Sequence, residues 1–150
     1  MSEIRLRVRG IPGAQGSKKL SKWGAMIESS KKVKPWRQDV RYASNYYYKG
    51  NPLDCPVSVS IEFIFARPKA HYRTGKYSSL LKESAPLHMT SKANGDIDKL
   101  CRSTLDALAE TSGGNILKDD SQVVMLSAEK RYCVSKSDSP GARISIIPLG

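Results

Sequence analysis

The sequence contains no long apolar run. None of its stretches approaches the roughly 20 consecutive apolar residues that a membrane-spanning helix needs. The first ten residues, MSEIRLRVRG, alternate charged with apolar side chains and include no signal-peptide apolar segment. We therefore expect no membrane partner, and we expect the protein to stay in the cytoplasm.

Cysteine is scarce and scattered. The three cysteines, Cys55, Cys101 and Cys133, are odd in number and form no CxxC pair. A structural zinc site needs closely spaced Cys and His ligands. The spacing therefore argues against zinc and indicates reduced thiols in a cytosolic protein.

Internal repeats and an interdomain linker are also missing. The hydrophobic fraction of 39% argues against disorder along most of the chain. A chain of 150 residues supplies one modest core. We expect a single domain over residues 1–150, with a long basic loop at about residues 67–94.

Acidic residues are few and unevenly placed. The chain has 14 Asp and Glu against 25 Lys and Arg, a net charge of +11. Residues 1–49 carry +9 and residues 67–92 carry +5, whereas residues 93–120 carry −3. Neutralising a phosphate releases counterions, so a basic surplus favours a phosphate-bearing partner. Because the bases do not gather on an amphipathic helix, we predict nucleic acid rather than an anionic membrane.

Apolar periodicity predicts an α+β fold. Period-two alternation indicates strands at residues 4–9, 57–65 and 143–147. Residues 122–126 indicate a further strand, which could run on toward Tyr132. Stripes at helical spacing indicate helices at about residues 35–47 and 97–109. The element order predicts one mixed β-sheet of about four to five strands, with two main helices covering one face. We expect the last two strands to form a hairpin.

Two basic segments are candidate phosphate contacts. Glycines and a proline between Gly10 and Gly16 break regular structure ahead of Lys18 and Lys19. This stretch either meets a phosphate or is a connecting loop with solvated charge, and the residues alone favour the loop. In the long loop, basic residues alternate with Tyr72 and Tyr77, which is typical of a segment that follows phosphates and stacks on bases. A mobile solvated loop is the alternative.

Four carboxylates form two tight pairs inside the acidic window. Residues two apart on an extended segment point the same way, so Asp96 and Asp98 could meet one cation. In a helix they would lie about 200° apart, so residues 95–96 should be non-helical and the helix should begin near Asp98. Adjacent strand residues face opposite ways, so at most one of Asp119 and Asp120 should enter the site directly.

Such oxygen ligands suit Mg²⁺, or Mn²⁺, which commonly takes a few carboxylates, waters and a substrate phosphate. The metal would polarise a scissile phosphate and activate a water, which is the chemistry of a metal-dependent nuclease. A purely structural reading stays open. Asp96 could cap the helix, Asp98 could favour its dipole, and Asp119 with Asp120 could form a turn.

The same residues resemble a known family. Residues 95–108, GDIDKLCRSTLDAL, and residues 117–124, LKDDSQVV, followed by Lys130, are similar to the core of the RusA family of Holliday junction resolvases. That family has a DxD segment followed by KL, a basic residue and DAL, then DDxQV, then a strand with a lysine. The order and spacing of these parts match.

This resemblance implies a small homodimeric, Mg²⁺-dependent crossover junction endodeoxyribonuclease, often carried by phages and prophages. Such an enzyme binds four-way DNA junctions in a bacterial or phage-infected cell and nicks two strands symmetrically during recombination and repair. The family's essential aspartates correspond to Asp96, Asp98 and Asp120, with Asp119 a weaker candidate. Its catalytic lysine corresponds to Arg102, which binds phosphate but does not readily shuttle a proton.

We therefore predict that Asp96, Asp98 and Asp120 hold the metal and that Arg102 contacts the scissile phosphate. Gly95 stands where relatives often have proline, so we expect a looser approach to the site. Two alternatives remain: a noncatalytic DNA-binding protein of the same fold, and a nuclease for flaps or other branched DNA. The predicted DNA-binding residues are Lys18, Lys19, Arg67, Lys69, Arg73, Lys76, Lys99 and Lys130.

Overall fold

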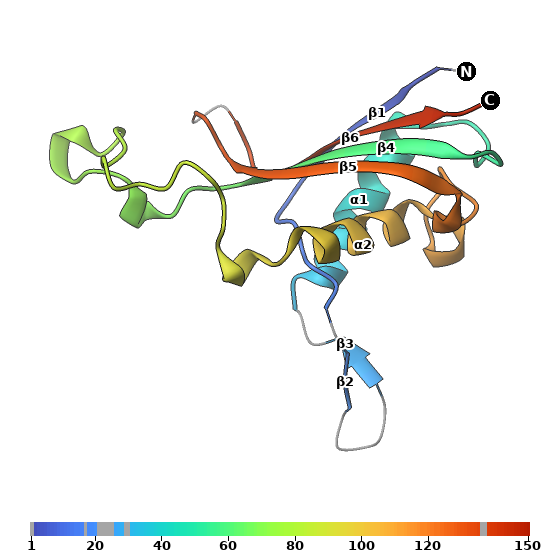
Figure 1. Ribbon diagram of the computed structural model, residues 1–150, viewed down its shortest axis with the longest axis horizontal. Coiled ribbons are helices and arrows are strands. Elements are labelled where there is room, and N and C mark those ends of the chain that lie inside the picture. The colour runs from blue at the N-terminus through green and yellow to red at the C-terminus, as the bar shows by residue number, and fades with distance from the viewer. Residues whose placement is uncertain (1, 17, 21–25, 29–30, 136–137) are drawn as a thin grey trace.

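A computed structural model of the protein describes residues 2–16, 18–20, 26–28, 31–135 and 138–150. Its centre is a four-stranded mixed sheet with two helices on one face (Figure 1). This arrangement confirms the predicted α+β class. The strands of this sheet are β1 (Ile4–Arg9), β4 (Val57–Phe65), β5 (Val123–Tyr132) and β6 (Gly141–Pro148), and the helices are α1 (Val33–Tyr47) and α2 (Ile97–Leu108).

The strand order β1-β6-β4-β5 contradicts the predicted hairpin of β5 and β6. β6 lies between β1 and β4 and is antiparallel to both, whereas β5 pairs in parallel with β4. A parallel pair needs a long crossover, which α2 provides. Burial agrees with this order: Ile144 and Ile146 of the inner strand β6 are buried, whereas Val124 and Met125 of the edge strand β5 are each 60% exposed.

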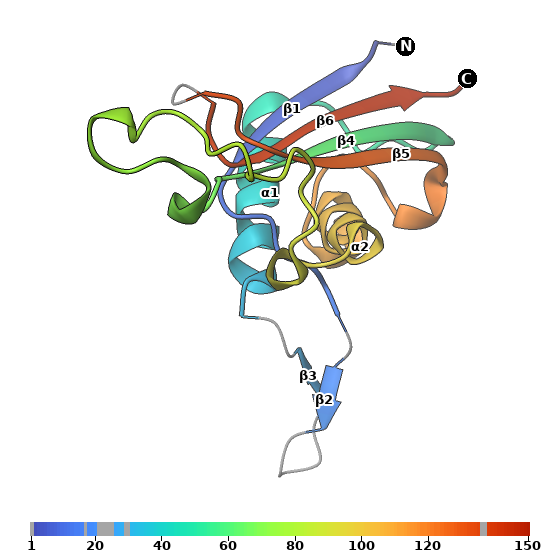
Figure 2. The same cartoon turned by 60° about the vertical axis from the view of Figure 1, so that its left-hand side comes forward.

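A second, two-stranded ladder was not predicted. β2 (Lys18–Leu20) pairs antiparallel with β3 (Met26–Glu28), where the residues had favoured a connecting loop. Strands of three residues are too short to show a period. Both views place this ladder away from the main sheet (Figures 1 and 2). The side chains of Lys18 and Lys19 lie outside the described residues, so their predicted phosphate contacts stay predictions.

The two helices pack against each other and against the sheet. Trp36, Val40 and Ala43 of α1 are buried, as their spacing predicts, but Tyr47 at the end of the helix is 48% exposed. The indole N–H of Trp36 donates a buried hydrogen bond of 3.0 Å to the Thr104 hydroxyl of α2. No helix among the described residues combines the length and apolarity needed to cross a membrane.

Burial also explains why the thiol of the cysteine in α2 stays protonated. Cys101, on the inner side of α2, is 5% exposed, and burial and the nearby Asp98 raise the pKa of its thiol to about 11. The thiol therefore stays protonated at neutral pH. All three cysteines are free, as predicted.

Residues 66–94, here called the arm, connect β4 to α2 and contain short 3₁₀ turns, an isolated β-bridge between Tyr72 and Leu81, and irregular backbone. Figures 1 and 2 show the arm reaching away from the end of the sheet and returning to the start of α2. Met89, in its returning half, is 2% exposed and belongs to the main core. The arm is therefore anchored to the body just before the acidic segment begins.

Candidate functional site

The first acidic pair lies where α2 begins. Asp96 is the N-cap residue with extended backbone, φ −80° and ψ 149°, and Asp98 lies in the first helical turn. Residues 95–96 are non-helical, as predicted. The Asp96 carboxylate makes no capping hydrogen bond and instead pairs with Lys99 at 3.7 Å. The Asp96 side chain therefore does not serve as a helix cap.

The second pair lies at the start of a 3₁₀ turn, Asp120–Gln122, just ahead of β5, with Asp119 as its N-cap residue. The Asp119 carboxylate accepts a hydrogen bond of 3.0 Å from the Ser121 N–H, and the Asp119 N–H donates to the Gln122 side-chain oxygen. The Gln122 amide also donates to the Leu53 carbonyl at 2.8 Å. Asp119 is thus the capping residue of a turn that Gln122 fixes to the preceding chain.

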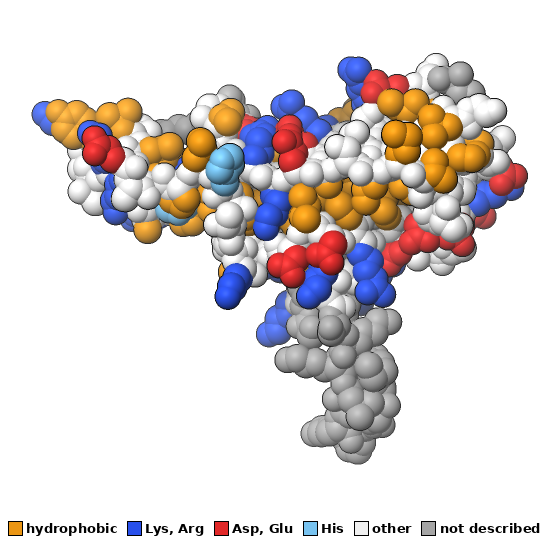
Figure 3. All heavy atoms as spheres, viewed as in Figure 1, with side chains coloured by type: hydrophobic (Ala, Val, Ile, Leu, Met, Phe, Trp, Pro, Cys, Tyr) orange, Lys and Arg blue, Asp and Glu red, His pale blue; other side chains and the backbone are white. Residues whose placement is uncertain are grey.

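One hollow, of about 450 Å³, lies between α2 and β5. Asp98 and Arg102 reach it from α2, and Asp120 reaches it from the 3₁₀ turn. Figure 3 shows an apolar band crossing this part of the surface, with acidic and basic side chains along its lower border. The remaining lining residues are Ile97, Cys101, Leu105, Leu126 and Ala128. The hollow brings together three of the four predicted catalytic residues, but not Asp96.

Asp106 is a further acidic neighbour, one helical turn beyond Arg102. Its carboxylate accepts a hydrogen bond of 2.9 Å from the side-chain amide of Gln15, which is 7% exposed. Hydrogen bonding to Asp119, partial burial and the Asp106 carboxylate raise the pKa of Asp120 to about 6. The helical spacing places Asp106 one turn beyond Arg102, but its contact with Asp120 depends on how α2 packs, and no sequence pattern indicates Gln15.

The aspartates predicted to bind a metal ion are only partly brought together. Among the residues that the structure describes, no group of three or more His, Cys, Asp or Glu side chains is placed to hold a metal ion. The predicted convergence of Asp96, Asp98 and Asp120 is therefore not observed. Two carboxylates on one open hollow still fit Mg²⁺, which commonly binds one or two carboxylates plus waters and substrate phosphates. The raised pKa of Asp120 agrees, because a bound cation would relieve the crowding of negative charge.

The crowding of negative charge around Asp120 predicts that the stability of the metal-free protein depends on pH. A carboxyl group whose pKa is higher in the folded state destabilises the fold when charged, so its penalty grows between about pH 4 and pH 6. We expect Asp120→Asn to raise the melting temperature in EDTA at pH 8 and to change it less at pH 4. Thermal unfolding at both values tests this, and an equal shift at both would contradict it.

The backbone that leads into Asp96 is held by neighbouring segments, contrary to the looser approach that we expected. Gly95 has φ +91°, which proline cannot adopt. The Lys130 ammonium donates a 3.2 Å hydrogen bond to the Gly95 carbonyl. A Cβ on Gly95 would lie 2.3 Å from the Cβ of Ala14. The backbone ahead of Asp96 is therefore fixed by contacts with two other segments.

We expect Gly95→Ala to lower the free energy of unfolding by about 1–3 kcal/mol, because the new methyl group meets both a positive φ and the Ala14 side chain. Urea unfolding measures this loss. Gly16→Ala is the matched control, because no atom lies within 4 Å of the methyl position there. A loss equal to that of the control would show that the Gly95 backbone relaxes freely.

The residues predicted to bind DNA differ in their exposure and in the groups that they contact. The Arg67 guanidinium lies 4.5 Å from the centre of the Tyr132 ring and donates a 2.7 Å hydrogen bond to the Pro86 carbonyl. Arg67 therefore links the arm to β5. Lys99 pairs with Asp96, and Lys130 contacts the Gly95 carbonyl, as described above. The remaining predicted contacts outside β2 are exposed on the arm: Lys69, Arg73 and Lys76.

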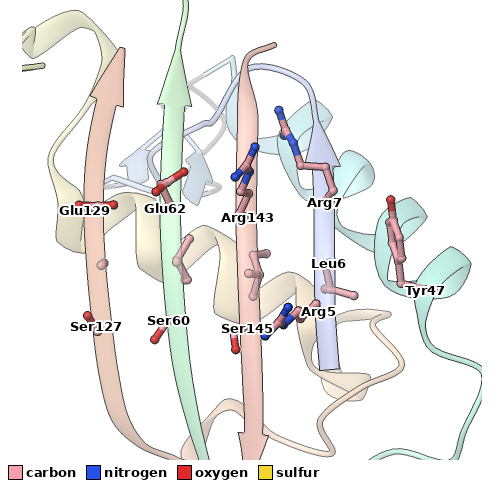
Figure 4. A pocket seen from close by; sticks show the side chains of 13 residues that line it. Arg5, Leu6, Arg7, Tyr47, Ser60, Glu62, Ser127, Glu129, Arg143 and Ser145 are labelled. Carbon is pink, nitrogen blue, oxygen red and sulfur yellow. The ribbon is translucent and has the colours of Figure 1, made fainter. Parts of the chain in front are cut away.

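A second hollow, of about 550 Å³, lies on the sheet face opposite the helices (Figure 4). Glu62 and Glu129 stand side by side there, and Arg143 and Arg7 continue the same row across the sheet. Glu62 pairs with Arg131 at 3.0 Å. None of the predicted site residues lines this hollow, so we place the candidate site at α2 and β5.

Comparison with known proteins identifies the family of the chain. No curated protein matches the chain. A family profile described as Endodeoxyribonuclease RusA matches residues 10–147, a span that includes every residue lining the hollow between α2 and β5. The chain belongs to the RusA endodeoxyribonuclease family.

Proposed function

We propose that the protein is a Mg²⁺-dependent endonuclease that resolves four-way DNA junctions by paired nicks during recombination and repair. The observation that carries this proposal is the hollow shared by Asp98, Arg102 and Asp120 in a member of this family. The net charge of +11 supplies the attraction to DNA phosphates.

Each lining residue has a chemical role in this proposal. Asp98 and Asp120 are the metal ligands that the hollow offers, and Asp96, just ahead of the helix, is the third candidate by the family pattern. When bound, Mg²⁺ or Mn²⁺ polarises the phosphate and lowers the pKa of a water. Arg102 presents a planar set of donors to the scissile phosphate and stabilises its developing charge.

Asp106 and Gln15 orient the ligand side of the hollow. The Gln15 amide donates a 2.9 Å hydrogen bond to the Asp106 carboxylate. Asp106 in turn lies close enough to Asp120 to raise the pKa of its carboxyl group. Gln15 is itself fixed, because its backbone N–H donates a 3.0 Å hydrogen bond to the Lys99 carbonyl of α2. These contacts hold Asp106 in place beside Asp120.

A homodimer is part of the proposal. Symmetric incision of two strands needs two equivalent sites, and two-fold symmetry supplies them from identical chains. The described part of one chain contains one hollow that joins aspartates to Arg102. Two copies would therefore carry one incision each.

Synthetic four-way, flap and linear DNAs, each incubated with Mg²⁺ or with EDTA, test the proposed function. With every strand labelled in turn, we expect paired symmetric nicks on the four-way junction, almost none on linear duplex, and none in EDTA. Cutting of flaps alone would favour a different branched substrate. Binding without cutting would favour a noncatalytic protein, a reading that the separation of Asp96 from the hollow keeps open.

A further inference from the structure

The arm exposes large apolar side chains as well as bases. The exposed fractions are 50% for Tyr77, 49% for Leu80, 41% for Leu81 and 78% for Leu87. Scattered apolar residues on a surface need no explanation, but this group occupies one short segment that projects from the body (Figure 1). The grouping indicates a contact surface.

The tip of the arm is a small hairpin. Tyr72 and Leu81 form an antiparallel bridge, flanked by backbone hydrogen bonds from Arg73 to Leu80 at 2.8 Å and from Lys82 to His71 at 2.9 Å. Gly75 supplies the positive φ, +69°, that the turn requires. Tyr77 and Leu80 are therefore presented from a hydrogen-bonded backbone, which reduces the ordering that a partner must impose.

The base of the arm is tied to the strand that borders the hollow. The Arg67 guanidinium and the His71 ring both pack on Tyr132, at 4.5 Å and 5.3 Å from its ring centre. Tyr132 ends β5, and the earlier β5 residues Leu126 and Ala128 line the hollow. The arm and the candidate site therefore share one rigid strand, so a partner held by the arm is placed relative to the site.

The charge of the arm limits the kind of partner. Lys69, Arg73, Lys76 and Lys82 are all exposed on it, against the single acid Glu83. The partner must therefore offer negative charge together with flat apolar faces. DNA meets both conditions where base pairs end or unstack, as they do at a branch point, whereas the interior of a linear duplex offers phosphates alone. An anionic membrane is a poorer match, because the arm contains no amphipathic helix.

We propose that the tip of the arm packs against an exposed base-pair face at the branch point of a DNA junction, with Tyr77 stacked on the base. Leu80 and Leu81 widen this apolar contact, and Lys69, Arg73 and Lys76 hold the flanking phosphates. The arm thereby distinguishes branched from linear DNA. This inference rests on the proposed function for its DNA partner and adds the residues that select the branch.

Tyr77→Ala tests the proposal. Binding is measured in EDTA to a four-way junction with 2-aminopurine at the branch, and to a linear duplex of the same sequence. Base–aromatic stacking is worth enough to expect about a tenfold loss of junction affinity, a smaller change in 2-aminopurine fluorescence on binding, and an unchanged duplex affinity. Tyr42→Ala is the matched control, because Tyr42 is 76% exposed on α1, outside the arm.

A second variant shows whether the loss caused by Tyr77→Ala belongs to the whole apolar surface of the tip. Leu80→Ser should reduce junction affinity in the same direction and leave duplex affinity unchanged. Lys69→Gln should weaken both DNAs alike, because a phosphate contact does not read branching. Equal losses on junction and duplex for Tyr77→Ala, or no loss on either, would overturn the proposal.

The binding assays separate this inference from the proposed function. If the wild-type protein binds junctions preferentially and Tyr77→Ala removes the preference without any cleavage being seen, the arm is supported and the nuclease proposal fails. If junctions are cut while Tyr77→Ala cuts and binds them as the wild type does, the arm proposal fails alone.

Discussion

Asp98→Asn is expected to lower the rate of junction cleavage by about 100-fold or more and to leave junction affinity within about twofold. Asp98 is exposed in the first turn of α2 and faces the hollow together with Asp120. Asparagine keeps the size of the side chain but removes the negative charge that a metal ligand needs. Single-turnover cleavage in Mg²⁺ and gel-shift binding in Ca²⁺ measure the two effects separately.

The fold should tolerate this change. A negative charge near a helix N-terminus contributes about 0.3–1 kcal/mol, so the loss of stability should stay within that range. Asp119→Asn is the matched control, because Asp119 caps its own turn and asparagine caps a helix about as well as aspartate. The control should cut junctions within about tenfold of the wild-type rate, which is less than the loss from removing one transition-state contact. Wild-type cleavage by Asp98→Asn would show that the hollow is not the site.

Local patterns predicted most of the elements. Strand β4 alternates Val57, Val59, Ile61 and Phe63 toward the core, and all four are buried. The strand pairing depends on contacts between segments far apart in the sequence, and no local pattern reports these. β6 is adjacent to β5 in the chain but lies on the other side of β4, where it pairs with β1 and β4. α2 returns the chain along the sheet, so that β5 pairs with β4 in parallel.

The candidate site was predictable in its residues but less so in its arrangement. Extended backbone at Asp96 follows from residue spacing and is observed. Only Asp120 of the second pair lines the hollow, but the strand alternation from which we predicted a single inward residue is absent, because the pair lies at a 3₁₀ turn ahead of β5. The contact between Asp106 and Asp120 depends on how α2 packs against the turn ahead of β5. Gln15 reaches Asp106 only because the N-terminal loop lies along α2. Such contacts are set by packing.

Arg102 gives the second large expected effect. Its side chain lies on the same face of α2 as Asp98, one turn further along, and lines the same hollow. If it contacts the scissile phosphate, Arg102→Ala should lower the cleavage rate by about 100-fold or more, because it removes a charge that stabilises the transition state. Single-turnover cleavage of the four-way junction measures this loss.

Arg102→Lys separates two roles for this position. Lysine keeps the positive charge and adds a group able to transfer a proton, whereas it lacks the planar pair of donors. If charge alone matters, Arg102→Lys should cut within about tenfold of the wild type, which is less than the loss from removing one such donor. A loss as large as that of Arg102→Ala would mean that the hollow depends on the geometry of the guanidinium. In that case the arginine would be a phosphate clamp specific to this chain, and not a substitute for the lysine of its relatives.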